Sequence, residues 1–543
     1  MYLQEEGKIW LATGSERVYL EPSMCNRHGL IAGATGTGKT VTLKVIAESF
    51  SDMGVPVFLA DIKGDLTGMC VPGVENKHIR RSIDTMHIEN FDYTTYPARF
   101  FDVYGKKGHP VRTTISDMGP ELLSRLLGLN DTQSGVLRIV FKIADDRGLL
   151  LLDLKDLRSM VQYVGDNAKE YKLQYGNIAP QSVGAIQRSL LMLEDEGGDQ
   201  FFGEPDLDIK DWFDWDDQGR GVMNILECQE LFQHPLLYGT FLLWMLTELY
   251  ELLPEVGDLD KPKIAFFFDE AHLLFKDAPK ALLEKVEQVV RLIRSKGVSV
   301  WFISQNPSDI PESVLSQIGN RVQHALRAYT PNEQKALRYA AKSFRVNPEF
   351  DTETVLQQLE TGQALVSVLD PKGVPTIVER AGILPPRSSM SIADESVVAQ
   401  VIAGSPLREK YDKSVDRISA YETLSAQNDE EENGEAAPAD TESSANPGRP
   451  KTKTELMEEQ LAREKAAKAE QSQSKTDKES EKEEKEKARA EAKAEKERER
   501  AKSRKKQSAA SKTAGKVVST AAGTVGRELG KSFVRGLLGI LKR

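Results

Sequence analysis

The sequence predicts an α/β fold with a mostly parallel sheet, and two observations predict it. Short apolar runs typical of strands alternate with amphipathic segments through residue 400. The runs are apolar at almost every position, which is typical of strands that helices cover on both faces. Parallel strands need crossover connections, and the amphipathic segments supply them.

We expect strands at residues 9–13, 16–21, 29–33, 55–61, 99–103, 221–227, 263–269, 298–304, 322–326, 364–369 and 376–379. Between about 116 and 215 the apolar residues recur with a period of 3.6, which predicts a helical insertion. The sequence thus divides into a core of residues 1–115 and 216–400 and an insertion at 116–215. The apolar run 236–253 contains Glu248 and Glu251, so we expect a buried helix there and no integral membrane segment.

Composition changes near residue 404. Residues 1–400 have 41 Lys+Arg against 56 Asp+Glu, and residues 501–543 have 11 against one. Few aromatic residues occur in 404–512, so we expect a charged low-complexity tail that is disordered or at most a solvated helix. Apolar residues recur every fourth position in 513–543, which predicts a basic amphipathic segment. We expect it to dock on a protein partner, still unidentified, in preference to lipid.

Several classes of protein are excluded by the cysteines and the N-terminus. Cys25, Cys70 and Cys228 form no CxxC pair, which argues against a disulfide framework or a thiolate zinc site. Acidic residues in the first seven positions argue against a signal peptide. We therefore expect a cytoplasmic protein.

A phosphate-binding loop is the strongest signal in the sequence. The pattern GxxxxGK[ST] is matched by Gly33, Ala34, Thr35, Gly36, Thr37, Gly38, Lys39 and Thr40, and it lies between an apolar strand and a helix. Glycines allow backbone N–H groups to turn toward a polyphosphate at the helix N-terminus. Lys39 is expected to reach the β and γ phosphates of ATP, and the Thr40 hydroxyl is expected to bind Mg²⁺.

Acidic and polar residues end two further strands. Asp269 and Glu270 follow the strand 263–269, and we expect Asp269 to hold Mg²⁺ and Glu270 to activate the attacking water. Acidic residues are also favoured at a helix N-terminus, which is the structural alternative. Gln305 follows the strand 298–304, where it could sense the γ-phosphate or simply cap a loop.

Other residues leave two interpretations open. Arg291 and Arg294 end the helix before the strand 298–304, where they either favour the helix C-terminus or reach a neighbouring subunit's nucleotide as an arginine finger. Asp61 begins the sequence Asp-Ile-Lys-Gly-Asp, which indicates either an Asx turn or a place near the metal. We expect His109, Trp212 and Trp215 to serve packing or turns.

The order Asp269-Glu-Ala-His272 is similar to the DEAH-box RNA helicases. Their two nucleotide motifs lie about a hundred residues apart as a family pattern, whereas 230 residues separate Lys39 from Asp269 here. The chain also lacks the Ser-Ala-Thr and QRxGRxGR motifs of those helicases. We therefore interpret the DEAH match as accidental.

A better match begins with Asn26-Arg-His-Gly-Leu-Ile-Ala-Gly and the phosphate-binding loop. It continues through Asp61–Asp65, Asp269-Glu270, Arg294, Ser304-Gln-Asn-Pro307 and Asn320-Arg-Val. This order resembles the HerA/FtsK superfamily of hexameric ATPases, and the segments 108–120, 127–133 and 535–539 look like bacterial YjgR-type proteins with a HerA-like C-terminal domain.

The resemblance implies a RecA-like P-loop fold and a homo-oligomeric, hexameric motor that binds ATP and Mg²⁺ and acts on DNA. It implies that Glu270 is the catalytic base, Gln305 the sensor, and Arg294 or Arg27 the finger. Only about 30 residues precede the strand before the loop, so we do not expect the nuclease partnership of HerA's N-terminal barrel to carry over to this chain. Excess negative charge over residues 1–400 gives no general attraction to DNA, so any contact needs a local basic lining. The alternative function is a nucleotide-switched regulatory or scaffolding ATPase.

Overall fold

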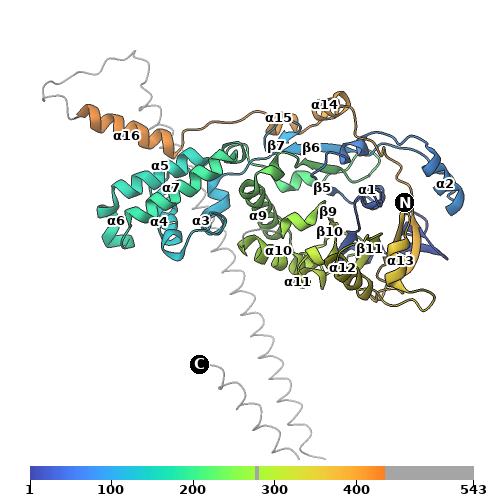
Figure 1. The fold of residues 1–543 in the computed structure, drawn as a ribbon. Coiled ribbons are helices and arrows are strands. Elements are labelled where there is room, and N and C mark those ends of the chain that lie inside the picture. The colour runs from blue at the N-terminus through green and yellow to red at the C-terminus, as the bar shows by residue number, and fades with distance from the viewer. Residues whose placement is uncertain (258, 276–279, 435–543) are drawn as a thin grey trace, which may run out of the picture. The chain divides into compact units, whose positions relative to one another are not determined.

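The computed structural model describes residues 1–257, 259–275 and 280–434. At its centre is a 13-stranded sheet with helices on both sides (Figure 1). The strands are β1 (Tyr2–Leu3), β2 (Lys8–Thr13), β3 (Arg17–Leu20), β4 (Gly29–Ala32), β5 (Val57–Asp61), β6 (Ala98–Asp102), β7 (His109–Pro110), β8 (Met223–Glu227), β9 (Ile264–Phe268), β10 (Val298–Ser304), β11 (Asn320–His324), β12 (Gln363–Ser367) and β13 (Glu379–Ile383).

The sheet has a parallel part and an antiparallel part. In the order β11-β4-β10-β9-β5-β8-β6-β7 every neighbouring pair is parallel. Beyond β11 the strands β12, β13 and β2 pair antiparallel. The prediction of an α/β fold with a mostly parallel sheet is confirmed.

The last expected strand is displaced. The sequence predicts it at residues 376–379, but the ladder with β12 is formed by Glu379–Ile383. Asp370 explains the shift because its carboxylate accepts hydrogen bonds from the N–H groups of Lys372 and Val374 and so lengthens the turn.

Alternating side chains of the central strands enter two separate cores. On β9, Phe266 and Phe268 pack on one face of the sheet, while Phe267 packs on the other with Trp301 of β10. Each fully buried side chain of this size contributes about 1.5–3 kcal/mol. Burial on both faces explains why these strands read as continuous apolar runs.

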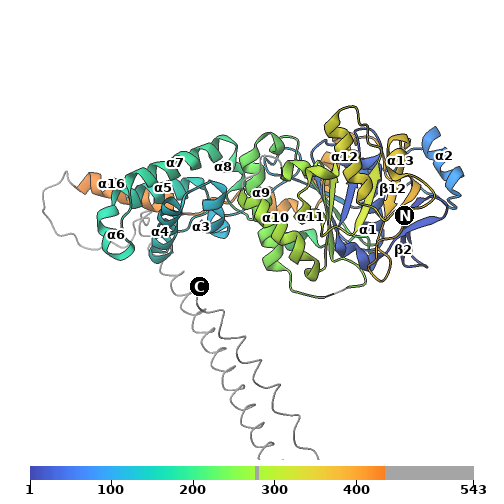
Figure 2. The same ribbon diagram turned by 60° about the horizontal axis from the view of Figure 1, so that its bottom comes forward.

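The helices are α1 (Lys39–Asp52), α2 (Lys77–Met86), α3 (Ile115–Leu126), α4 (Asp131–Arg147), α5 (Leu154–Asp166), α6 (Ala168–Tyr175), α7 (Pro180–Asp195), α8 (Gly198–Phe201), α9 (Pro235–Leu252), α10 (Lys280–Leu292), α11 (Glu312–Leu315), α12 (Pro331–Lys342), α13 (Thr352–Gln358), α14 (Glu395–Gly404), α15 (Arg408–Tyr411) and α16 (Ala420–Gly434). Helices α3–α8 follow one another between β7 and β8, and Figure 2 shows them beside α9. Capping boxes begin two of them, at Asn130 for α4 and at Asp153 for α5.

Helix α9 is the buried helix expected at 236–253. Phe241 and Trp244 pack against Phe201 of α8. Among the described helices, none combines the length and the apolar character that crossing a bilayer requires. Trp212 also packs as expected, against Phe58, whereas Trp215 is half exposed and its indole N–H donates to the Gly54 carbonyl.

Packed structure continues past the expected boundary at residue 404. Tyr411 is fully buried and its hydroxyl accepts a hydrogen bond from the Asp208 N–H, while Asp412 lies 2.7 Å from Nδ1 of His109. Helix α16 packs along α5, and Leu424 is buried there. The boundary at 404 is therefore too early, because a few bulky residues among many charged ones suffice for docking. The rest of the expected tail, 435–512, and the amphipathic segment 513–543 lie outside the described residues.

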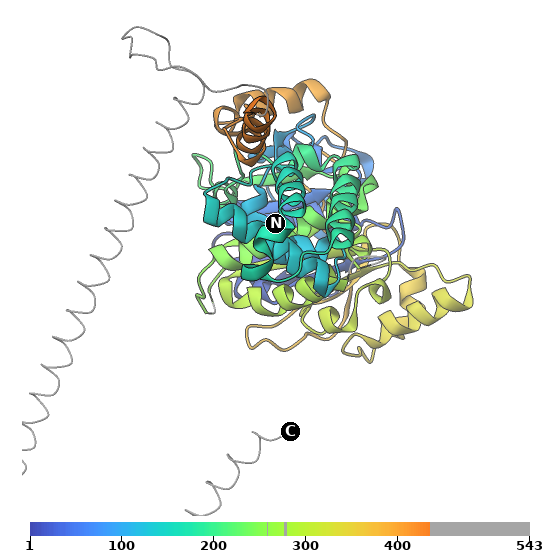
Figure 3. The same ribbon diagram turned by 90° about the vertical axis from the view of Figure 1, so that its left-hand side faces the viewer.

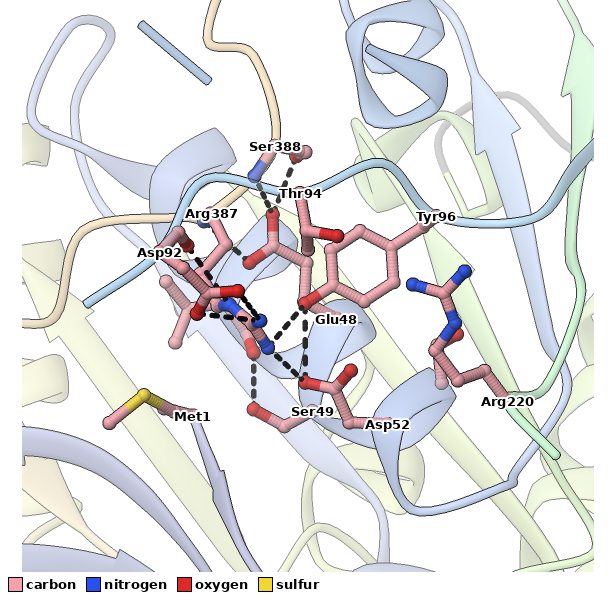
Figure 4. Close-up of polar contacts among 12 residues, drawn as sticks. Met1, Glu48, Ser49, Asp52, Asp92, Thr94, Tyr96, Arg220, Arg387 and Ser388 are labelled. Carbon is pink, nitrogen blue, oxygen red and sulfur yellow. Dashed lines mark hydrogen bonds and ion pairs between the residues drawn. The ribbon is translucent and has the colours of Figure 1, made fainter. Parts of the chain in front are cut away.

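A polar cluster that is buried at Glu48 and Ser388 ties the chain after β13 to helix α1 (Figure 4). The Glu48 carboxylate accepts hydrogen bonds from the N–H groups of Arg387 (2.8 Å) and Ser388 (2.9 Å). The Arg387 guanidinium pairs with Asp52 at 3.1 Å and with Asp92 at 2.8 Å. Helix α1 is thereby held through its C-terminal half, which fixes the position of its N-terminus at Lys39.

A buried histidine links the start of β4 to its neighbours. Nε2 of His28 lies 2.8 Å from the Val290 carbonyl of α10, and Nδ1 accepts a hydrogen bond from Val300 N–H of β10. These partners require the neutral ring with its hydrogen on Nε2. Burial lowers the pKa of His28 to about 4, and the Arg294 charge acts in the same direction.

This histidine predicts a pH dependence of stability. A histidine in the unfolded chain binds a proton below about pH 6.5, whereas folded His28 does so only below about pH 4. The free energy of unfolding therefore decreases as the pH falls through that interval. Between pH 7 and 5 the loss attributable to His28 is about 2 kcal/mol. In denaturant unfolding at both pH values, His28→Asn should remove this part of the dependence, since the Asn side chain does not titrate. An unchanged dependence in the variant would contradict the assignment.

Candidate nucleotide-binding site

The carboxyl ends of four adjacent strands meet at one edge of the sheet. In the order β4-β10-β9-β5 these ends lead to Gly33, Gln305, Asp269 and Asp61. The four sequence signals, which are up to 272 residues apart, therefore lie side by side. In open α/β sheets this edge is where ligands bind.

The loop after β4 has the backbone that a phosphate requires. Gly36 and Gly38 adopt positive φ values of 76° and 116°, which side-chain-bearing residues rarely adopt. A Cβ at Gly33 would lie 2.5 Å from Cβ of His324. The N–H groups of Gly33 and Ala34 bond to strand-end carbonyls. Thr35 is exposed at the tip of the loop. The first N–H groups of α1 have no partner within the helix, so they are available to a polyphosphate.

Lys39 is drawn back onto its own loop. Its Nζ donates to the carbonyls of Gly33 at 2.7 Å and Ala34 at 3.1 Å, and burial lowers the pKa of the ammonium. The hydroxyl of Thr37 donates to the same Ala34 carbonyl. The loop is thus closed around internal donors that a phosphate would compete for.

His324 supports the loop from behind and was not singled out from the sequence. Its Nδ1 donates to the Gln363 carbonyl at 3.0 Å, and its Nε2 accepts from Oγ1 of Thr42 at 2.8 Å. Burial lowers its pKa to about 4, so the ring is neutral. The available signal was a histidine at the end of a buried strand, beside the loop strand.

Asp65 is a second residue that sequence reasoning gave no role. One of its carboxylate oxygens accepts from the Thr40 hydroxyl at 3.3 Å, and the other is buried without a hydrogen-bond partner among the described residues. Hard oxygen ligands of this kind are those that Mg²⁺ prefers. Thr40 and Asp65 therefore offer oxygen ligands of the kind that suits a magnesium ion.

Asp61 is occupied by its own turn. Its two oxygens accept from the N–H groups of Gly64 at 2.7 Å and Leu66 at 3.0 Å, as in the Asx-turn alternative. Burial raises the pKa of Asp61 to about 7, with Asp65 and Asp269 adding to the shift. Asp61 thus shapes the loop that carries Lys63 and Asp65.

Asp269 and Glu270 are both buried, and Lys63 bridges them. Nζ of Lys63 lies 3.0 Å from Asp269 and 2.6 Å from Glu270. Nε2 of Gln305 donates to the other oxygen of Glu270 at 3.4 Å. Glu270 has a positive φ of 45°, a strained conformation that proteins retain mainly at functional sites.

The ionisation of this group depends on Lys63. Burial raises the pKa of Asp269 despite the nearby ammonium. Burial would also raise the pKa of Glu270, but the hydrogen bond and charge of Lys63 outweigh it and lower that pKa. Glu270 is therefore held as a carboxylate, the form that accepts a proton.

The two candidate finger residues lie at the opposite edge. Arg27 precedes β4 and Arg294 precedes β10, whereas the loop and Gln305 follow these strands. At about 3.3 Å per residue, β4 alone separates Arg27 from the loop by about 13 Å. Nε of Arg27 is buried without a hydrogen-bond partner in the described chain. Neither arginine is brought to the site of its own chain.

Lys63 gives a stability prediction. Lys63→Met leaves two buried carboxylates without their cation, which should cost about 1–2 kcal/mol of unfolding free energy once the exposure of Lys63 is considered. Denaturant unfolding of nucleotide-free protein measures it. Lys106→Met is the control, because Lys106 makes an exposed pair with Glu230 and should cost well under 1 kcal/mol. Equal stability of the two variants would show that the bridge is inert.

Comparison with known proteins identifies the family. A probable helicase of Methanocaldococcus jannaschii is 28% identical over 154 residues, which cover 26% of this chain and 28% of that protein. The chain thus matches little more than a quarter of this curated relative. The plasmid coupling protein TrwB with a bound GTP analogue has 14% identity and a TM-score of 0.47, covering 69% of this chain and 91% of that one.

VirB4 of Thermoanaerobacter pseudethanolicus also has 14% identity, with a TM-score of 0.46, covering 69% of this chain and 96% of that one. The family model described as "Helicase HerA-like C-terminal" matches residues 6–465, which is most of the chain. The protein therefore belongs to the HerA-like helicase C-terminal family.

Proposed function

We propose that this protein is a ring-forming ATPase that hydrolyses ATP and couples hydrolysis to movement along DNA. One observation carries the proposal: three features meet at one edge of the sheet. They are the phosphate-binding loop, the oxygen ligands of Thr40 and Asp65, and the buried carboxylate of Glu270, whose φ is positive. Family membership supports the same activity.

Each residue has a distinct task in the proposed reaction. The amides of the loop and Lys39 hold the polyphosphate, and Thr40, Asp65 and Asp269 would hold Mg²⁺. When bound, Mg²⁺ neutralises charge on the phosphates. Glu270 accepts the proton of the attacking water, and Gln305, which is hydrogen-bonded to Glu270, reports on the γ-phosphate. Lys63 must release Glu270 before that carboxylate can bind water.

The site is completed by a neighbouring subunit in this proposal. Arg27 and Arg294 lie at the edge opposite their own loop, so either can act as a finger only on another copy of the chain. A closed ring repeats one such contact around its axis. We therefore propose a homo-oligomer, with a hexamer as the expected form from the family resemblance.

A switched scaffolding ATPase is the second candidate, favoured by the net negative charge of residues 1–400. Such a protein would change its assembly with nucleotide and would not need DNA. The two candidates differ in whether DNA accelerates hydrolysis.

Two variants separate binding from hydrolysis. Lys39→Ala should weaken nucleotide affinity by about 10- to 100-fold, because a charge-assisted contact to phosphate is lost. Glu270→Gln should retain affinity and lose at least about 10² in kcat, because an amide cannot accept the proton. Fluorescent-nucleotide binding and phosphate release measure the two effects. Glu227→Gln, at the end of β8 on the same edge, is the control and should retain kcat. Undiminished turnover in Glu270→Gln would remove the assignment of the base.

A mixing experiment tests the shared site. Arg294→Ala and Glu270→Gln should each be inactive, since a finger contributes about 10³ to 10⁵ in rate. In an equal mixture about a quarter of the contacts combine both wild-type groups, so about a quarter of the activity should return. Arg188→Ala, which changes an exposed arginine of α7, should stay active. A mixture that remains inactive, or a fully active monomer, would contradict a shared site.

A further inference from the structure

Helix α12 carries a row of basic side chains on one side. Lys335, Arg338 and Lys342 are spaced by three and four residues, and Arg345 follows three residues later. This spacing places Lys335, Arg338 and Lys342 along one face of α12, whereas Arg345 lies beyond the end of the helix and donates a hydrogen bond to the Pro375 carbonyl. All four are exposed, and Figure 3 shows the yellow helix at the margin of the fold. We call these four residues the basic stripe.

The stripe lies on the face directed away from the protein. Leu337 and Ala340 of α12 and Phe344 after it are buried in a small core with residues of α13 and β12. These positions lie about half a turn around the helix from the stripe at 100° per residue. The outward direction of the basic side chains is therefore fixed by packing.

No carboxylate within the described chain forms an ion pair with the stripe. Glu333 is the acidic residue of α12, and its carboxylate is already used by the N–H groups of Tyr329 and Thr330 at the helix start. Like charges three and four residues apart destabilise a helix. The basic stripe therefore destabilises α12 by charge repulsion, and an anionic partner would remove that repulsion.

Helix termini explain only part of the row. Lys342 lies in the last turn of α12, where a cation is favoured, but Lys335 and Arg338 do not. The basic residues of α2 differ, because Arg80 pairs with Glu75 and Asp84. Residues 326–346 hold five basic residues and one acidic residue, in a core with net negative charge.

We propose that the basic stripe binds the phosphate backbone of a nucleic-acid strand. From Lys335 to Lys342 the helix rises about 10 Å. That length covers about three base-pair steps of a duplex, at about 3.4 Å of helix axis each. The exposed rings of Tyr329 and Tyr339 accompany the stripe and offer stacking surfaces for unpaired bases. This inference deepens the DNA part of the proposed function and does not depend on ATP hydrolysis.

An acidic neighbour limits the path of the strand. Tyr339 shares a surface hollow with Asp309 and Glu312. Their carboxylates disfavour a phosphate in the hollow, so the path runs along the stripe itself.

The test compares full-length proteins by fluorescence anisotropy with single- and double-stranded DNA over a range of salt concentrations. The variant K335Q/R338Q/K342Q loses three phosphate contacts, so the slope of log K against log salt should fall by about 2.7 for duplex and about 2 for single strands. The control K77Q/R80Q/R81Q removes the same charge from exposed positions of α2. Its slope should differ from that of wild type by less than about 0.9, the value for one phosphate contact on duplex DNA. The basic C-terminal segment is common to all three proteins.

Denaturant unfolding establishes that each variant is folded, whether or not it hydrolyses ATP. If the slope falls equally in both variants, DNA binding depends only on the total charge of the protein, and the assignment to α12 is overturned. Binding of poly-glutamate with the same dependence on the stripe would assign it to an acidic protein and overturn the nucleic-acid partner. If wild type binds no DNA while still hydrolysing ATP, both this inference and the DNA half of the proposed function fail. If ATP hydrolysis alone is missing, the stripe is unaffected.

Discussion

The parallel pairing of β4 with β10 and of β10 with β9 is the constraint on which the nucleotide site depends. Parallel strands end at the same edge, so Gly33, Gln305 and Asp269 meet although they are distant in the sequence. The same pairing places Arg27 and Arg294 at the other edge. The parallel direction of these strands therefore brings the site residues together at one edge. It also places at the opposite edge the arginines that would serve a neighbouring subunit.

Electrostatics make this edge a place for a divalent cation. Among the described residues, the four carboxylates of Asp61, Asp65, Asp269 and Glu270 face three ammonium groups, those of Lys39, Lys44 and Lys63, so that acidic groups are in excess. Burial is the main cause that raises the pKa of Asp61 to about 7, and repulsion by Asp65 and Asp269 adds to it. A divalent cation would relieve that excess, and Lys63 acts in its place between Asp269 and Glu270.

The sequence predicts the sheet, the loop and the acidic pair because each has a local pattern of apolar runs, glycines or strand-end carboxylates. Lys63, Asp65 and His324 could not be given roles, because their partners are set by strand order, which one sequence does not show. The boundary at residue 404 failed for a related reason. Tyr411 is flanked by charged residues and Leu424 by mostly small and polar ones, and only the surfaces they cover reveal their burial.

The most direct test of a DNA-driven ATPase is phosphate release by the full chain with ATP and Mg²⁺, measured without DNA and with single- or double-stranded DNA. We expect slow hydrolysis without DNA and a several-fold acceleration by DNA, because a motor couples ATP turnover to movement along its track. Absence of hydrolysis in every condition would contradict the nucleotide site. Hydrolysis that ignores DNA would contradict the motor and leave the switched scaffold.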